Sequence, residues 1–288
     1  MSNQEKDECP TPRGTLLIIG GKEDKDDTSA KENKNKEFVP NEILKTFVAL
    51  IKKEKPVVEV ITSGSSEGDA SFKEYKKVFN ELGLLNINHI HHNQRNNIDT
   101  EELNQRVLKA DAFFFTGGNQ LLLSSLYGGT HFLTTLKERY IYQNIVIAGT
   151  SAGAMALSTP MIYAGNKEVE QIGGEIKVTT GLEFLHDVCI DTHFVHRGRF
   201  VRMAQVIATN PACIGIGIDE NTAIVVKNGQ DAEVTGAGVV IVIEGTGMSH
   251  SNMEDFNEGK LVSIRDLRMH ILSKGDKYHI NINNPPHK

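Results

Sequence analysis

The sequence predicts an α/β fold: a three-layer αβα sandwich on a mainly parallel, doubly wound sheet with antiparallel C-terminal edge strands. Thr15–Ile19 is a short continuous apolar run, typical of a strand buried on both faces of a parallel sheet, and further strands are expected in the runs Val57–Thr62 and Ala112–Phe115. Amphipathic segments with helical period alternate with these runs, which indicates βαβ units. From Ala223 onward, apolar runs alternate around tight glycine turns, as antiparallel edge strands do.

The helices follow from apolar stripes and capping signals. Asn41 is expected to cap a helix whose apolar face is formed by Ile43, Leu44, Phe47, Leu50 and Ile51. A second helix is predicted from Ser71 to Leu82, before a stop at Gly83. After a short strand at Ile87–His91, the spacing Asp99-x-x-Glu102 predicts a capping box that opens the next helix.

Length and composition bound the organisation of the chain. Its 288 residues, with 39% hydrophobic and 24% charged, are ordinary for a soluble globular protein. We expect a flexible tail over residues 1–13 and a single α/β domain over residues 14–288. The polar segment Asp24–Lys36 is expected to form a solvated loop, and Pro160–Glu183 is expected to form a hairpin beside the candidate functional residues described below.

Several function classes are disfavoured. A net charge of −6 argues against a nucleic-acid binder, because neutralising phosphates needs a basic surface. No apolar run approaches a membrane span, and the polar start suggests no signal peptide, so a cytoplasmic protein is expected. The three cysteines have no metal-ligand spacing, and His91 and His92 are interpreted as strand-end histidines, so no metal site is predicted.

A candidate nucleophile lies in Gly149-Thr150-Ser151-Ala152-Gly153. This G-x-S-x-G pattern follows the apolar run Ile145–Ala148 and precedes a small-residue helix, as a nucleophile elbow requires. The turn is expected to strain Ser151, with the Ala152 amide beside it as an oxyanion donor. The glycine turn after Ala112–Phe115 could supply the second donor at Gly118.

A base and an acid are expected further along the chain. The run Val188–Thr192 is expected to resume the sheet and to place His193 at a strand end, with His196 as a competitor. Glu220, after the run Ile214–Ile218, is the preferred acid, although Asp191 and Asp219 also compete. Three arginines near His193 (Arg197, Arg199 and Arg202) favour carboxylate recognition. The order serine, histidine, acid differs from that of α/β-hydrolases.

The chain resembles the cyanophycinase family of serine peptidases, which has the class I glutamine amidotransferase-like fold and also contains aspartyl dipeptidases. The resemblance rests on motifs in one order: Gly20-Gly21-x-Glu23-Asp24, Phe115-Thr116-Gly117-Gly118-Asn119-Gln120, Gly149-Thr150-Ser151-Ala152-Gly153-Ala154, Asp191-x-His193-Phe194-x-x-Arg197-Gly198-Arg199-x-x-Arg202, Gly215-Ile216-Gly217-Ile218-Asp219-Glu220-Asn221-Thr222-Ala223 and His270-Ile271-Leu272-Ser273-x-Gly275-Asp276. It therefore spans nearly the whole chain after residue 14.

The resemblance implies a function and a set of site residues. It implies a triad of Ser151, His193 and Glu220, with substrate bound by Gln120, Asp191, Thr192, Arg197, Arg199 and Arg202. The implied substrate is cyanophycin, a poly-aspartate that bears arginine on each β-carboxyl, cleaved to β-Asp-Arg dipeptides without metal or organic cofactor by a homodimer.

One position departs from the family pattern. Where the family typically has Asp-Gln-His, this chain has Asp191-Thr192-His193, and the shorter threonine side chain puts substrate choice in doubt. The alternatives are an aspartyl or isoaspartyl dipeptidase of the same family and a non-catalytic binder of acidic peptides.

Overall fold

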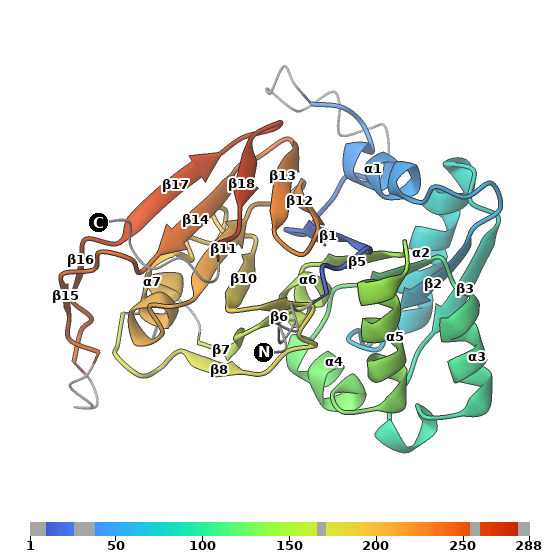
Figure 1. Cartoon of the computed structure of the whole chain (residues 1–288), viewed down its shortest axis with the longest axis horizontal. Coiled ribbons are helices and arrows are strands. Elements are labelled where there is room, and N and C mark those ends of the chain that lie inside the picture. The colour runs from blue at the N-terminus through green and yellow to red at the C-terminus, as the bar shows by residue number, and fades with distance from the viewer. Residues whose placement is uncertain (1–9, 26–37, 166–170, 254–259, 282–288) are drawn as a thin grey trace, which may run out of the picture.

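A larger sheet with five parallel strands at one end dominates the computed structural model, which describes residues 10–25, 38–165, 171–253 and 260–281 (Figure 1). The parallel strands lie in the order β1 (Thr15–Ile19), β5 (Val146–Thr150), β4 (Ala112–Phe115), β2 (Val57–Ile61) and β3 (Asn86–Ile90). Beyond β1 the sheet continues antiparallel, through β12 (Thr222–Lys227), β13 (Asp231–Gly236) and β18 (Lys277–His279). The predicted α/β class, with a mainly parallel sheet and antiparallel edge strands, is confirmed.

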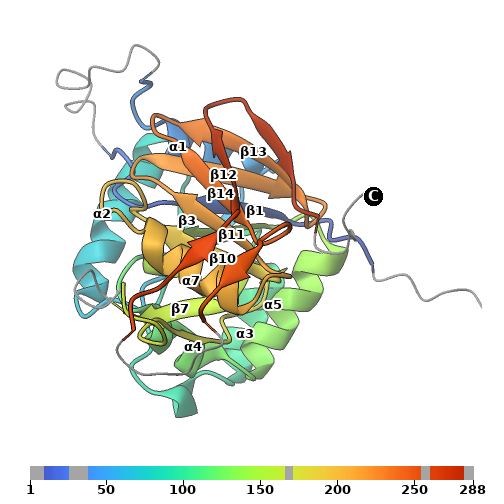
Figure 2. The ribbon, with the colours of Figure 1, turned by 90° about the vertical axis from the view of Figure 1, so that its left-hand side faces the viewer.

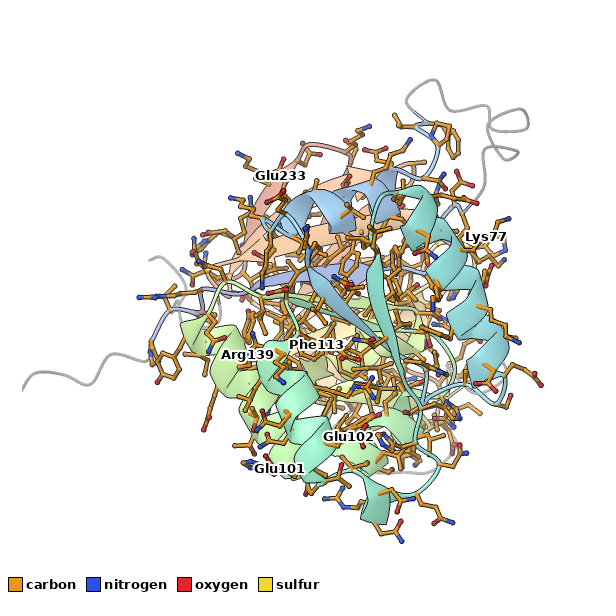
Figure 3. All side chains as sticks on the ribbon, turned by 90° about the vertical axis from the view of Figure 1, so that its right-hand side faces the viewer. Lys77, Glu101, Glu102, Phe113, Arg139 and Glu233 are labelled. Atoms are coloured by element: carbon orange, nitrogen blue, oxygen red, sulfur yellow. The ribbon has the colours of Figure 1, made fainter. Side chains whose placement is uncertain are left out.

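Helices cover both faces of this sheet. On β1, Leu17 and Ile19 face the cluster that contains α1 (Glu42–Leu50) and α2 (Gly68–Glu81), while Leu16 and Ile18 face the opposite cluster. The opposite cluster takes in α3 (Glu101–Lys109), α4 (Gln120–Tyr127) and α5 (His131–Tyr142), and a short 3₁₀ turn, η2 (Arg95–Asn97), precedes α3. Figure 3 shows α3 and α5 side by side, with Glu101 and Glu102 at the start of α3.

A second, six-stranded sheet packs against the first. Its order is β17 (Arg268–Leu272), β14 (Val240–Glu244), β11 (Ile214–Ile218), β10 (Val188–Thr192), β6 (Ser158–Thr159) and β9 (Leu185–His186). Figure 2 shows β10, β11 and β14 side by side, with α7 (Phe200–Thr209) against them. The expectation that Val188–Thr192 resumes the first sheet is wrong, because β10 pairs with β11 and β6.

The third run of the predicted antiparallel edge, at Val240–Glu244, also belongs to the second sheet rather than the first. β12 and β13 form the expected hairpin around Asn228-Gly229, both at positive φ. The following strand β14 instead crosses to the second sheet, where it pairs with β11 and β17. Two further pairs complete the described strands: β7 (Met161–Ala164) with β8 (Lys177–Thr179), as expected for the hairpin, and β15 (His250–Ser251) with β16 (Ile264–Arg265).

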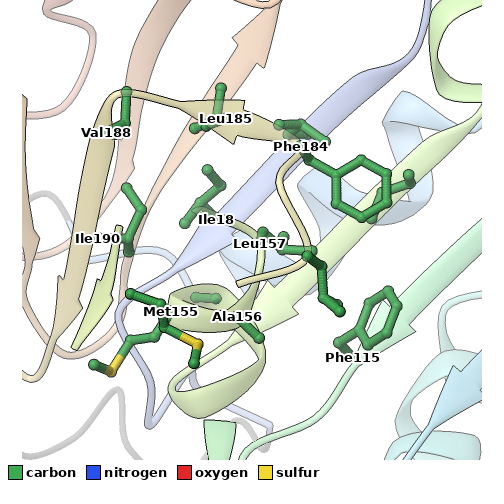
Figure 4. Packing of buried hydrophobic residues seen from close by; sticks show 14 of the residues in the cluster. Ile18, Phe115, Met155, Ala156, Leu157, Phe184, Leu185, Val188 and Ile190 are labelled. Atoms are coloured by element: carbon green, nitrogen blue, oxygen red, sulfur yellow. The ribbon is translucent and has the colours of Figure 1, made fainter. Parts of the chain in front are cut away.

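One hydrophobic cluster joins the two sheets. Figure 4 shows Ile18 of β1 and Phe115 of β4 in the same region as Met155 of helix α6 (Ala152–Ala156) and Val188 of β10. This continuity supports the proposal that residues 14–288 form one domain. Of the predicted tail, residues 1–9 lie outside the described residues, and the Arg13 amide donates to the Ile141 carbonyl at 3.0 Å.

Two predicted helix caps are wrong in detail. Asn41 occupies the N-cap position of α1 in a left-handed conformation (φ 55°), and its side chain makes no capping hydrogen bond. Its amide donates instead to Asp24 Oδ2 at 3.0 Å, so Asp24 is buried rather than part of a solvated loop, while residues 26–36 of that loop lie outside the described residues. The N-cap of α3 is Thr100, whose side chain accepts from the Leu103 amide. Asp99, the predicted cap, accepts instead from the Phe132 amide.

The strand-end histidines are satisfied by hydroxyl groups. His91 Nδ1 lies 2.9 Å from Thr62 Oγ1, and His92 Nδ1 lies 3.3 Å from the Tyr127 hydroxyl. Among the described residues no group of three or more His, Cys, Asp or Glu side chains could hold a metal ion. None of the helices in that part of the chain is long and apolar enough to cross a membrane.

Candidate active site

Ser151 lies at the sharp turn between β5 and α6. Its backbone has φ 52° and ψ −116°, a conformation that non-glycine residues rarely adopt and that tertiary structure must hold in place. The Ser151 amide donates to the Ile19 carbonyl of β1 at 3.0 Å. The flanking glycines are required by space, because a Cβ at Gly153 would lie 2.3 Å from the Phe115 carbonyl oxygen. The geometry is that of a nucleophile elbow.

His193 approaches Ser151 from the second sheet. It follows β10, has a φ of 49°, and its amide donates to the Gly20 carbonyl at 2.9 Å. The Nε2 atom of His193 lies 3.0 Å from Ser151 Oγ. The imidazole is thus within hydrogen-bond reach of the serine hydroxyl, as a general base must be.

Glu220 completes a hydrogen-bonded chain with these two residues. It follows β11, and its Oε1 lies 2.7 Å from His193 Nδ1 and 3.1 Å from Lys22 Nζ. The competing candidates are placed elsewhere: Asp219 Oδ1 accepts from the His196 amide, and the His196 side chain is 62% exposed, with Nδ1 3.9 Å from Glu220 Oε2. The structure therefore brings together Ser151, His193 and Glu220.

The surroundings set the charge states of the base and the acid. Burial lowers the pKa of His193 below its ordinary value, and the nearby Arg197 and Arg199 act in the same direction, against the hydrogen bond to Glu220. Burial alone would raise the pKa of Glu220, but the hydrogen bonds from His193 and Lys22 lower it below its ordinary value. A neutral imidazole beside an ionised carboxylate is the arrangement that a general base requires.

The predicted oxyanion donors lie at two turns beside Ser151. Ala152 is the first residue of α6, so its amide is one of the helix-start donors without an intrahelical acceptor. The Gly117-Gly118 turn abuts the serine, since a Cβ at Gly117 would lie 3.5 Å from Ser151 Cβ. The next amide, of Asn119, donates to the Gly64 carbonyl at 2.8 Å and anchors the turn.

Asp191 is the clearest departure from the expected site. Its side chain is 0% exposed, and both of its oxygens are occupied by Arg199 and Arg202 from the start of α7. Arg199 Nη1 lies 2.8 Å from Oδ1, and Arg202 Nε lies 2.6 Å from Oδ2. The expectation that Asp191 binds substrate does not fit, because the protein's own arginines occupy its buried carboxylate.

The other expected substrate-binding residues differ in access. Arg202 is buried against Asp191, and Thr192 is 1% exposed, with a buried Oγ1 that has no hydrogen-bond partner among the described residues. The Gln120 amide donates to the Ile162 carbonyl of β7 at 2.9 Å. Arg197 is exposed and, within the described part of the chain, forms no ion pair, so it is the arginine best placed to meet a substrate carboxylate.

Glu23, to which the sequence assigned no role, contacts Thr150, the residue before Ser151. The Glu23 carboxylate is buried, accepts from Thr150 Oγ1 at 2.6 Å, and also accepts from the Tyr75 hydroxyl. The sequence did hold a signal for a functional role of Glu23. Glu23 and Asp24 follow a buried strand and a glycine pair at the carboxyl edge of the sheet, where ligand sites form in α/β folds.

Comparisons with known proteins identify the family. The family model described as peptidase family S51 matches residues 28–234 of this chain, which include Ser151, His193 and Glu220. The chain belongs to peptidase family S51. S51 peptidases are serine-type enzymes, so this protein is a serine-type peptidase.

The curated S51 relatives are similar over almost the full chain. The cyanophycinase of Synechococcus elongatus is 31% identical over 276 residues, which are 96% of this chain and 82% of that protein. The cyanophycinase of Geminocystis herdmanii is 29% identical over 273 residues, covering 95% and 96%. Among solved structures, a peptidase from an acI-B1 Actinobacterium superposes with a TM-score of 0.64 at 20% identity over 94% of this chain and 98% of its own. This structural likeness shows a shared fold.

Proposed function

We propose that this protein is a serine exopeptidase that hydrolyses cyanophycin to β-Asp-Arg dipeptides through an acyl-enzyme on Ser151. The observation that carries the proposal is the hydrogen-bonded chain from Ser151 through His193 to Glu220, with distances of 3.0 and 2.7 Å. It occurs in an S51 peptidase that is 29–31% identical to cyanophycinases of several cyanobacteria.

The chemistry follows from the charge states of these three residues. Neutral His193 takes the Ser151 proton at Nε2 as Oγ attacks the substrate carbonyl, and Glu220 stabilises the imidazolium that forms. The amides of Ala152 and Gly118 are the proposed donors to the tetrahedral oxyanion. His193 then gives its proton to the leaving amine, and water, deprotonated by the same imidazole, cleaves the acyl-enzyme.

Substrate recognition is assigned to a smaller set than the sequence suggested. Arg197 is exposed beside the triad and suits a carboxylate of the acidic polymer. Arg199 and Arg202 are assigned a structural role rather than substrate contact, because they neutralise buried Asp191 and anchor the start of α7. The comparisons with cyanophycinases do not favour the aspartyl dipeptidase alternative or a non-catalytic binder of acidic peptides.

A panel of substrates tests the proposal. The purified protein is incubated with cyanophycin, with β-Asp-Arg and with α- and β-linked aspartyl dipeptides, and the products are identified by mass spectrometry. We expect soluble β-Asp-Arg from the polymer, with the dipeptides left intact. Cleavage of the dipeptides with the polymer untouched would overturn the assignment. A homodimer, expected from the family resemblance, and a cytoplasmic location belong to the same proposal and are tested by light scattering and by cell fractionation.

A further inference from the structure

Glu23 is a buried carboxylate whose place in the fold is not explained by stability alone. Its side chain is 5% exposed, and the residue makes no ion pair among the described residues. Its partners are two hydroxyl groups: Thr150 Oγ1 at 2.6 Å and the Tyr75 hydroxyl. Because burying a charge costs free energy, packed apolar side chains would serve a purely structural purpose as well or better.

The partner that matters for chemistry is Thr150, the residue before Ser151. Thr150 is the last residue of β5, is 3% exposed and pairs with Ile19 of β1. Directly after it, the chain enters the strained conformation of Ser151, with φ 52°. A hydrogen bond from Thr150 to Glu23 restrains the chain at the point where that strain begins.

The five residues that contain Glu23 also contact the base and the acid. The Gly20 carbonyl accepts from the His193 amide, and the Gly21 carbonyl accepts from the Asn221 amide, each at 2.9 Å. Lys22 Nζ lies 3.1 Å from Glu220 Oε1. Ser151 follows β5 of the larger sheet and His193 follows β10 of the smaller sheet, so no strand pairing joins these two residues, whereas Glu220 lies between β11 of the smaller sheet and β12 of the larger one. The segment 20–24 supplies that connection.

We propose that Glu23 is a positioning residue for Ser151, acting through Thr150, and that segment 20–24 holds the nucleophile against the His193–Glu220 pair. The inference rests on the proposed function, in which Ser151 is the nucleophile. Tyr75 supports this arrangement as a permanent donor, since burial and the charge of Glu23 raise the pKa of its hydroxyl well above the ordinary value. Displacement of the nucleophile by a fraction of an ångström is expected to slow acylation without weakening substrate binding.

Substitutions that keep shape test the inference. Glu23→Gln removes the charge, Thr150→Val removes the hydroxyl, and Thr150→Ser keeps it. We expect Glu23→Gln and Thr150→Val each to lower kcat about 10- to 100-fold with KM unchanged, and Thr150→Ser to retain the wild-type kcat. The double variant Glu23→Gln/Thr150→Val is expected to be no slower than Thr150→Val alone, because Glu23→Gln weakens the same hydrogen bond that Thr150→Val removes. The rate of Ser151 phosphonylation by an organophosphonate, followed by intact mass, is expected to fall in parallel.

Glu59→Gln is the matched control. Glu59 is a fully buried carboxylate on β2, two strands from β5, where it is hydrogen-bonded by Arg106 and Asn88. This variant is expected to melt at a lower temperature and to keep the wild-type kcat and labelling rate. If Glu23→Gln behaves like Glu59→Gln, the inference is overturned. Should Glu23→Gln not fold, equal kcat values for Thr150→Val and Thr150→Ser would overturn it. Activity in Ser151→Ala would instead refute the proposed function.

Discussion

The Nδ1 atom of His193 lies 2.7 Å from Oε1 of Glu220. Because an ionised carboxylate only accepts hydrogen bonds, Nδ1 carries the proton and the Nε2 lone pair faces Ser151 Oγ. The two residues follow adjacent parallel strands, β10 and β11, of the smaller sheet. The Glu220 carboxylate thus selects the tautomer of the base.

Glu220→Gln is expected to lower kcat by about 10²- to 10⁴-fold while the protein stays folded. An amide can donate to Nδ1 and thereby favour the tautomer with its proton on Nε2, which cannot accept from serine. Steady-state kinetics and a melting curve check the result. Asp219→Asn is the control, since its carboxylate accepts only from the His196 amide among the described contacts and is expected to leave kcat nearly unchanged. The reverse ranking would make Asp219 the acid.

Arg197→Gln is expected to shift the pH profile of kcat/KM. Activity needs neutral His193 and is lost as the pH falls through the His193 pKa, which burial, with help from Arg197, lowers. Removing this repulsive cation raises the pKa of the imidazole, so the acid limb moves to higher pH. Arg265→Gln, an exposed arginine on β16, is the control and leaves the limb in place. An unchanged limb in Arg197→Gln would show that Arg197 does not act on His193.

Asp191→Asn is expected to reduce stability rather than substrate affinity. Arg202 is 7% exposed and loses the carboxylate that compensates its charge, a loss of about 3–5 kcal/mol in the free energy of unfolding. Urea denaturation measures the change. The control is Asp231→Asn at an exposed ion pair with His279, which is expected to change stability little. A raised KM with unchanged stability would return Asp191 to the substrate-binding set.

Gly21→Ala is expected to lower kcat by about 100-fold through displacement of the base. A Cβ at Gly21 would lie 2.6 Å from both Cε1 and Nε2 of the His193 ring, and φ there is +100°. Gly83→Ala separates this collision from the general strain of positive φ, because Gly83 has φ +92° and nothing within 4 Å of the added atom. Equal kcat values in the two variants would rule out the collision with His193.

The positions of several strands along the chain could be predicted, but the sheet that each strand joins could be predicted only in part. Apolar runs correctly located β1 and β4, because a strand buried on both faces needs that composition, and a mainly apolar run that contains Glu59 located β2. The same composition fits β10 equally well, and nothing in its side chains says which sheet it joins. That choice follows from pairing with β11 and β6, which are distant in sequence.

The candidate site could be located from the sequence where a strained backbone requires glycines, as it does around Ser151. Glycines around Ser151 and the acids and histidines at strand ends marked the triad candidates. Asp191 was misjudged because arginines near an acid in sequence do not reveal whether they face it: Arg199 and Arg202 turn back from α7 onto its carboxylate. The contact between Glu23 and Thr150 could not be predicted, because it joins residues 127 positions apart.

Hydrolysis of cyanophycin by wild type, Ser151→Ala and Ser125→Ala tests the central claim most directly. Ser125 is an exposed serine of α4 and serves as the matched substitution. Released β-Asp-Arg is quantified by chromatography after confirming equal melting temperatures. The account predicts equal release by wild type and Ser125→Ala and none by Ser151→Ala. Equal release by wild type and Ser151→Ala, or intact polymer with wild type, would contradict it.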